Sequence, residues 1–145
     1  MKLTLLSIIL LLVTHIASAE TGVARSVFST AIENKEPVSD LQKISSAITR
    51  VYFFTELMGL SGHKISHRWE YQGKIMAEIT FEIGADRWRT WSSKNMLSSW
   101  TGSWQVSVVD EGGNIIEQKS FEYIGESSPR ADAETLTAPV SEGVP

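Results

Sequence analysis

The chain of 145 residues contains no cysteine. This absence excludes disulfide bonds, thiolate nucleophiles, cysteine-ligated zinc and lipid attachment through cysteine. An exported form of the protein must therefore be stabilised by its packed core alone. Apolar residues make up 42% of the sequence and charged residues 21%, which is the composition of one ordinary globular domain with short appendages.

The chain also lacks a strong charge of either sign, because 13 basic residues face 17 acidic ones and the net charge is −4. Nucleic-acid-binding proteins usually present a basic face, so this balance argues against a nucleic-acid partner. No glycine-rich loop precedes a helical pattern, since Gly112-Gly113 lies between two strand patterns. The sequence therefore shows no phosphate-binding loop, and we expect no cofactor.

A long amphipathic helix pattern is missing as well, which argues against a parallel sheet with crossover helices. Instead, seven segments show the β-branched composition or the alternation typical of strands. They cover residues 23–32, 48–57, 65–71, 75–83, 87–93, 102–110 and 115–124. We predict an all-β fold, an antiparallel immunoglobulin-like sandwich of about seven strands, with a small β-barrel as the alternative. Residues 38–46 and 94–101 are expected to be connections.

One hairpin carries an internal conflict of register. A two-residue turn at Gln72-Gly73 would pair Trp69 with Met76 and leave Trp69 and Ile75 on opposite faces of the sheet. Cross-strand partners share a face, so the apolar stripes of the two strands would not meet. We therefore predict a β-bulge or a longer loop in this hairpin.

The first 19 residues have the order of a secretory signal peptide. Lys2 precedes an apolar run of 14 residues, and Ala17-Ser18-Ala19 is a small-residue cleavage site. We predict cleavage at about Ala19/Glu20 and a periplasmic or secreted mature protein. The alternative is an uncleaved N-terminal membrane anchor, although the run is shorter than the roughly 20 residues that a spanning helix needs. A membrane contact is expected only through this segment, and only if it is not cleaved.

In the last part of the chain, apolar residues do not recur at the spacing of a helix or a strand. Residues 126–145 are rich in Ser, Thr, Pro and acidic residues, a composition typical of disorder. We therefore predict a disordered acidic tail over residues 126–145, following a β-sandwich domain over residues 20–125.

Four segments in order resemble a known family. They are Val-Tyr-Phe-Phe-Thr-Glu-Leu at 51–57, Gly-His-Lys-Ile-Ser-His-Arg-Trp-Glu-Tyr at 62–71, Arg-Trp-Arg-Thr-Trp-Ser-Ser-Lys at 87–94 and Trp-Thr-Gly-Ser-Trp-Gln-Val-Ser-Val-Val-Asp at 100–110. Together they resemble the bacterial family called domain of unknown function 2914, over about residues 51–123. The resemblance implies a small all-β domain of a bacterial envelope protein and implies no reaction.

Tryptophan and basic residues concentrate in one part of the sequence, and four of the five tryptophans fall between positions 88 and 104. Alternation places Trp88 and Trp104 in the core. Tryptophan and arginine are enriched at binding interfaces, and strand ends and loops often carry function on a rigid β scaffold. The candidate binding residues are Arg87, Arg89, Trp91, Lys94 and Trp100. We predict a non-catalytic binding module whose partner is an envelope protein or glycan.

Two other functions stay open at this point. One is an envelope-polymer hydrolase that uses Glu78 and His67, and the other is a purely structural envelope domain. No catalytic or metal-binding residues are assigned, because residues four apart on a strand are roughly 13 Å apart. That spacing is too long for His63 and His67 to share a metal ion. We expect His67 to be half-buried beside Trp69, and Glu82 to pair with Arg89 across a hairpin.

Overall fold

The computed structural model describes residues 20–126, so the predicted signal peptide and all of the predicted tail except Glu126 lie outside the described residues. Within residues 20–126 the chain forms ten strands in three sheets. They are β1 (Gly22–Ser29), β2 (Ile32–Glu33), β3 (Glu36–Pro37), β4 (Lys43–Ser45), β5 (Arg50–Met58), β6 (Lys64–Tyr71), β7 (Lys74–Glu82), β8 (Arg87–Asn95), β9 (Gly102–Asp110) and β10 (Ile115–Ile124). The all-β prediction is confirmed. No helix in this part of the chain is long and apolar enough to cross a bilayer.

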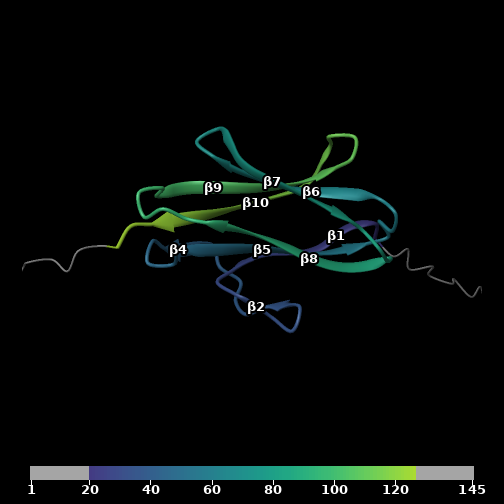
Figure 1. Ribbon diagram of the computed structural model, residues 1–145, viewed down its shortest axis with the longest axis horizontal. Coiled ribbons are helices and arrows are strands. Elements are labelled where there is room, and N and C mark those ends of the chain that lie inside the picture. The colour runs from purple at the N-terminus through teal and green to yellow at the C-terminus, as the bar shows by residue number, and fades with distance from the viewer. Residues whose placement is uncertain (1–19, 127–145) are drawn as a thin grey trace, which may run out of the picture.

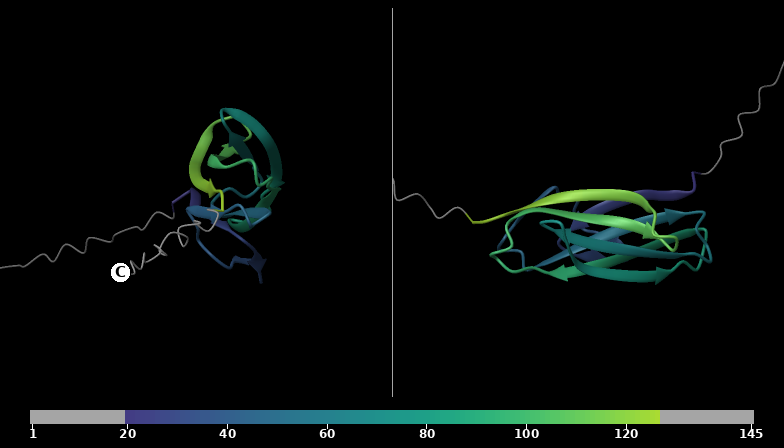
Figure 2. Two further views of the ribbon diagram at one scale, coloured as in Figure 1. Left: turned by 90° about the vertical axis from the view of Figure 1, so that its left-hand side faces the viewer. Right: turned by 90° about the horizontal axis from the view of Figure 1, so that it is seen from above.

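The strands form two facing layers (Figure 1). One layer is a three-stranded sheet with the order β1-β5-β8, and the other is a five-stranded sheet with the order β4-β10-β9-β6-β7. The strands of both layers run along the long axis of the molecule (Figure 2). In residues 20–126 the sheets do not close into a barrel, so the alternative architecture is not adopted. All pairs are antiparallel except β4 with β10, which is parallel.

The core lies between the two layers and is strongly aromatic. Phe28 of β1 and Phe53 of β5 meet Trp69 of β6, Trp104 of β9 and Phe121 of β10, and all five are buried. Their ring centroids lie 4.6–6.5 Å apart in the pairs that touch. Each large aromatic side chain contributes about 1.5–3 kcal/mol by burial, which stabilises a domain without disulfides.

The conflict in the β6–β7 hairpin is resolved by a bulge, as predicted. The turn keeps two residues, Gln72 and Gly73, both at positive φ, and Tyr71 pairs with Lys74. The register then shifts between Trp69 and Glu70, so that Trp69 pairs with Ala77. The inward residues of β6 consequently share a face with the apolar residues of β7, and both stripes reach the core.

The prediction of a hairpin between β7 and β8 is wrong. β7 pairs with β6 in the five-stranded sheet, whereas β8 pairs with β5 in the three-stranded sheet, so the chain changes layer at residues 83–86. Glu82 therefore lies within 3.7 Å of Lys64 instead of Arg89. Arg89 forms its ion pair with Glu36.

Three further boundaries differ from the sequence prediction. The first strand, predicted over residues 23–32, ends at Ser29, and residues 32–37 form the small β2–β3 hairpin (Figure 1). Residues 38–46, expected to be a connection, contain a short strand, β4. β8 continues to Asn95, so Lys94 belongs to a strand and the loop begins at Met96.

The β2–β3 hairpin covers the outer face of the three-stranded sheet. Figure 1 shows it on the side of that sheet turned away from the other layer. Phe54 points to this outer face, because its neighbour Phe53 points to the core, yet Phe54 is fully buried. The Arg25 guanidinium carbon lies 4.8 Å from the centroid of the Phe54 ring. The outer face is therefore a structured surface with its own packing.

Candidate ligand-binding surface

Three of the five predicted binding residues share the outer face of β8. Arg87, Arg89 and Trp91 alternate with residues that point inward, and they pair with Met58, Glu56 and Phe54 of β5. Alternation along a strand places every second side chain on one face, so the sequence pattern Arg-x-Arg-x-Trp aligns the three on one surface. Trp88 lies between them on β8, points to the opposite face and packs against the core, as its alternation predicts.

Two glutamates hold the arginines of this surface in place. Glu56 of β5 pairs with Arg87 through the arginine Nε, and its other carboxylate oxygen lies 3.6 Å from Arg25. Glu36 of the β2–β3 hairpin lies 2.5 Å from Arg25 and 2.8 Å from Arg89. The ion pairs join β1, β3, β5 and β8, so the guanidinium groups are fixed by segments far apart in the sequence.

The ion pairs also fix the charge of Glu36. The hydrogen bond from Arg25 lowers the pKa of Glu36 below its ordinary value of 4.5, and the charges of Arg25, Arg89 and Arg87 act in the same direction. Glu36 consequently remains ionised at moderately acidic pH, and the hairpin stays tied to the arginines under those conditions.

A shallow depression of about 370 Å³ opens beside these residues. It is lined by Lys35, Ala85, Arg87, Trp88, Arg89 and Trp91. We call it the arginine–tryptophan depression. Its lining carries three cationic side chains and no carboxylate, although the whole chain has a net charge of −4. Indole rings and an alanine supply its apolar surface, a combination typical of small-ligand sites.

Close backbone packing determines where Trp88 lies at the depression. A Cβ atom at Gly84 would lie only 3.0 Å from two ring carbons of Trp88. The absence of a side chain at Gly84 therefore lets the indole lie against the backbone where the chain changes layer. The Trp88 side chain packs against the core and also lines the depression, so the wall of the depression is continuous with the core.

The other two predicted binding residues lie elsewhere. Lys94 has the opposite parity to Trp91 on β8 and sits roughly 10 Å further along the strand. Its Nζ lies 5.2 Å from the centroid of the Trp100 ring, a cation–π contact. Trp100 packs against Trp104, and its carbonyl oxygen accepts a hydrogen bond of 2.9 Å from the Trp104 Nε1–H. The five residues thus form two separate groups, and the first group lines the depression of about 370 Å³.

The structure also contains a buried polar network that the sequence analysis missed. His67 is fully buried, not half-buried as expected, and its Nε2 lies 3.0 Å from Thr55 Oγ1. Its Nδ1 lies 2.9 Å from Ser92 Oγ, which also accepts a hydrogen bond from Trp69 Nε1–H. Burial lowers the pKa of His67 from 6.5 to about 3, so the ring is neutral. The sequence did offer one signal of this burial, because His67 occupies an inward-facing position in the alternation of β6. Its partners come from the other sheet, which sequence periodicity does not reveal.

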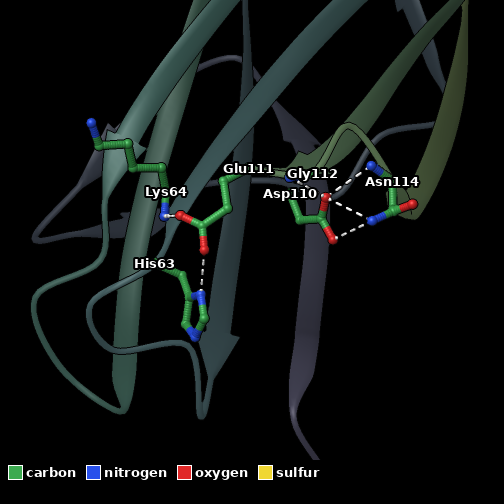
Figure 3. A network of polar contacts seen from close by, with 6 residues as sticks. All are labelled: His63, Lys64, Asp110, Glu111, Gly112 and Asn114. Carbon is green, nitrogen blue, oxygen red and sulfur yellow. Dashed lines mark hydrogen bonds and ion pairs between the residues drawn. The ribbon is translucent and has the colours of Figure 1, made fainter.

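Neither of the two histidines within residues 20–126 has the surroundings of a metal site. His63 is exposed in the loop before β6, and its Nδ1 lies 2.7 Å from Glu111 Oε1 (Figure 3). In the turn between β9 and β10, which contains Glu111, Asp110 accepts hydrogen bonds from the side chain and backbone of Asn114. These bonds lower the pKa of Asp110. Within residues 20–126 no three His, Asp or Glu side chains gather as a metal site would require.

The acidic residues considered for hydrolysis lie on the outer face of the five-stranded sheet. Glu78 is 2.8 Å from Arg68 in an ion pair, and Arg68 follows the inward-facing His67 on β6. Successive residues point to opposite faces of a strand, so Glu78 and His67 lie on opposite faces of the sheet. The fold does not bring these two groups together.

Fold and surface together define a two-layer all-β domain with a basic, tryptophan-lined depression at β8, an edge strand of its three-stranded sheet. Residues 62–123 match the family model described as a protein of unknown function (DUF2914). The resemblance drawn from the four segments is thereby confirmed for residues 62–123, which run from the loop before β6 into β10. No curated protein matches the chain.

Proposed function

We propose that this chain is a non-catalytic binding or interaction module of the bacterial cell envelope, periplasmic or secreted, whose partner is an envelope protein or glycan. The supporting observation is the arginine–tryptophan depression. In an acidic chain, three cationic side chains and two indoles gather around one hollow of about 370 Å³. Ion pairs hold the arginines in advance, which reduces the entropy lost when a ligand binds.

The immunoglobulin-like classification of the sandwich is part of the same proposal. Two facing layers and predominantly antiparallel pairing support it. We favour a binding role over the hydrolase alternative because Glu78 and His67 lie on opposite faces of one sheet. We favour it over a purely structural role because Trp91 and Trp100 are only partly buried.

Affinity capture tests this function. Purified protein with Trp91→Ala should recover much less of its partner from envelope fractions than the wild type does. Trp100→Ala is the matched control, since Trp100 is a partly buried tryptophan away from the depression. Equal recovery by the wild type and the Trp91 variant would contradict the proposal, provided that both variants unfold cooperatively.

A further inference from the structure

We propose that the arginine–tryptophan depression binds an acidic sugar, meaning a pyranose residue that carries a carboxylate. The inference rests on the proposed binding function and names the chemical class of its ligand. Three features of the surface carry it: cationic groups with unused hydrogen-bond donors, a strained lysine at the rim, and apolar walls that fit a ring.

Arg87 and Lys35 have donors available for a ligand. The Arg87 side chain is 60% exposed, and among its own three guanidinium nitrogens only Nε donates to a carboxylate of residues 20–126, that of Glu56. Both terminal nitrogens of that guanidinium are free to form the paired hydrogen bonds that carboxylates accept. Lys35 is exposed and makes no ion pair in the same part of the chain.

Lys35 occupies a backbone position that disfavours lysine. The β2–β3 hairpin closes through Asn34 and Lys35, at φ values of 50° and 62°. A two-residue turn of this kind prefers Asn followed by Gly, because a side chain at the second position is strained. Strained residues concentrate at functional sites. Here the strained residue contributes a cationic side chain to the lining of the depression, beside the arginines of β8.

The apolar part of the depression consists of two indole rings and an alanine. Its lining on β8 extends only from Arg87 to Trp91, roughly 13 Å of strand. Trp88, Trp91 and Ala85 offer apolar surface for the C–H groups of a sugar, while the cations receive its carboxylate. This length accommodates one or two sugar rings, and the flat faces of two indoles suit the C–H face of a pyranose better than the flexible side chains of an acidic peptide.

Calorimetric titration of the full chain with three probes tests the ligand class. The probes are a trimer of galacturonic acid, its methyl ester with the carboxylates blocked, and hexaglutamate. We expect the acidic trimer to bind at least about tenfold more tightly than the ester or the peptide, a difference of about 1.4 kcal/mol. Equal binding of the ester would overturn the role of the carboxylate. Equal binding of hexaglutamate would overturn the assignment to a sugar.

Two variants of the hairpin separate binding from folding. Lys35→Gly should weaken binding of the acidic trimer by about tenfold, the loss of one charge-assisted hydrogen bond, while its unfolding midpoint rises because the strain is relieved. Asn34→Gly changes the same turn but keeps the lysine, so its affinity should equal that of the wild type. Equal weakening by both variants would show that hairpin shape is responsible and would contradict the proposal.

Failure of this proposal differs from failure of the proposed function. If the acidic trimer does not bind, the acidic-sugar assignment is wrong. The binding function is then judged by the capture experiment with Trp91→Ala, which requires no knowledge of the ligand. Loss of capture in that variant would leave the binding function in place without an acidic sugar as its ligand.

Discussion

His67 Nδ1 lies 2.9 Å from Ser92 Oγ, and this contact joins the two sheets inside the core. His67 belongs to β6 of the five-stranded sheet, whereas Ser92 belongs to β8 of the three-stranded sheet. Ser92 also accepts the Trp69 indole N–H, and Thr55 contacts the other nitrogen of the His67 ring. Every polar group of this network has a partner, so the two layers are fixed in one relative position.

Removal of the Ser92 hydroxyl should destabilise the domain. Ser92→Ala leaves the Trp69 N–H and one nitrogen of His67 buried without a partner, which costs about 1–3 kcal/mol. Urea unfolding followed by tryptophan fluorescence measures the change. Ser93→Ala is the matched control, because Ser93 is exposed on the same strand and its loss should cost less than about 0.5 kcal/mol. Equal shifts in the two variants would show that the network contributes nothing.

The buried histidine should make stability depend on pH. The unfolded chain takes up a proton near pH 6.5, whereas the folded protein resists protonation of His67 until about pH 3. The free energy of unfolding therefore falls as the pH drops from 6.5 towards 3, with a loss of about 2 kcal/mol by pH 5. Urea midpoints at pH 7 and pH 5 measure this loss.

Two histidine variants isolate the source of the pH dependence. His67→Gln should have a smaller change between pH 7 and pH 5 than the wild type. His63→Gln should retain the full change, because His63 is exposed. A change that is the same in wild type and in His67→Gln would assign the effect to other groups.

A methyl group at Gly84 should disturb Trp88. The added Cβ of Gly84→Ala would lie 3.0 Å from the Trp88 ring, closer than ordinary contact. Overpacking of this kind costs about 1–3 kcal/mol, and it should shift the indole that lines the depression. Gly125→Ala is the control, since its nearest neighbour would be 3.7 Å away. Thermal unfolding of the two variants measures the difference, and the melting temperature of Gly84→Ala should be the lower one. Equal melting temperatures would contradict the packing argument.

The tryptophans should differ sharply in their effect on stability. Trp104 is fully buried, and Trp104→Ala should cost about 3–5 kcal/mol. Trp91 is partly buried on the outer face, and Trp91→Ala should cost roughly 1 kcal/mol from its smaller loss of buried surface. Chemical denaturation of the two variants measures the difference. A loss at Trp91 as large as that at Trp104 would make Trp91 a structural residue and not a binding residue.

Periodicity in the sequence predicted the strands well, because alternation records which side of a strand is buried. It placed Trp104 in the core and Trp88 against it, and it predicted the bulge in the β6–β7 hairpin. It did not predict that β8 leaves β7 and joins β5. Successive strands with a short connection usually form a hairpin, and only packing between layers decides otherwise.

The same limit explains the outcome for the candidate site. Arg87, Arg89 and Trp91 share one face because they alternate on one strand. Lys94 was grouped with them because it is close in sequence. It lies three residues after Trp91 on β8, so its side chain points to the opposite, inner face of the sheet, where it contacts Trp100. Lys35 and Glu36 come from a hairpin about fifty residues earlier, and no local pattern links them to β8.

Photo-crosslinking in intact cells tests the central claim most directly. Ala85 lines the depression without contributing charge, so a photoreactive residue at position 85 should leave the surface intact. The same residue at Glu122, which is exposed on β10 of the other sheet, is the control. We predict a crosslinked envelope component from position 85, absent from position 122 and lost when Trp91→Ala is added. Crosslinks of equal yield from both positions, or none from position 85, would contradict the account.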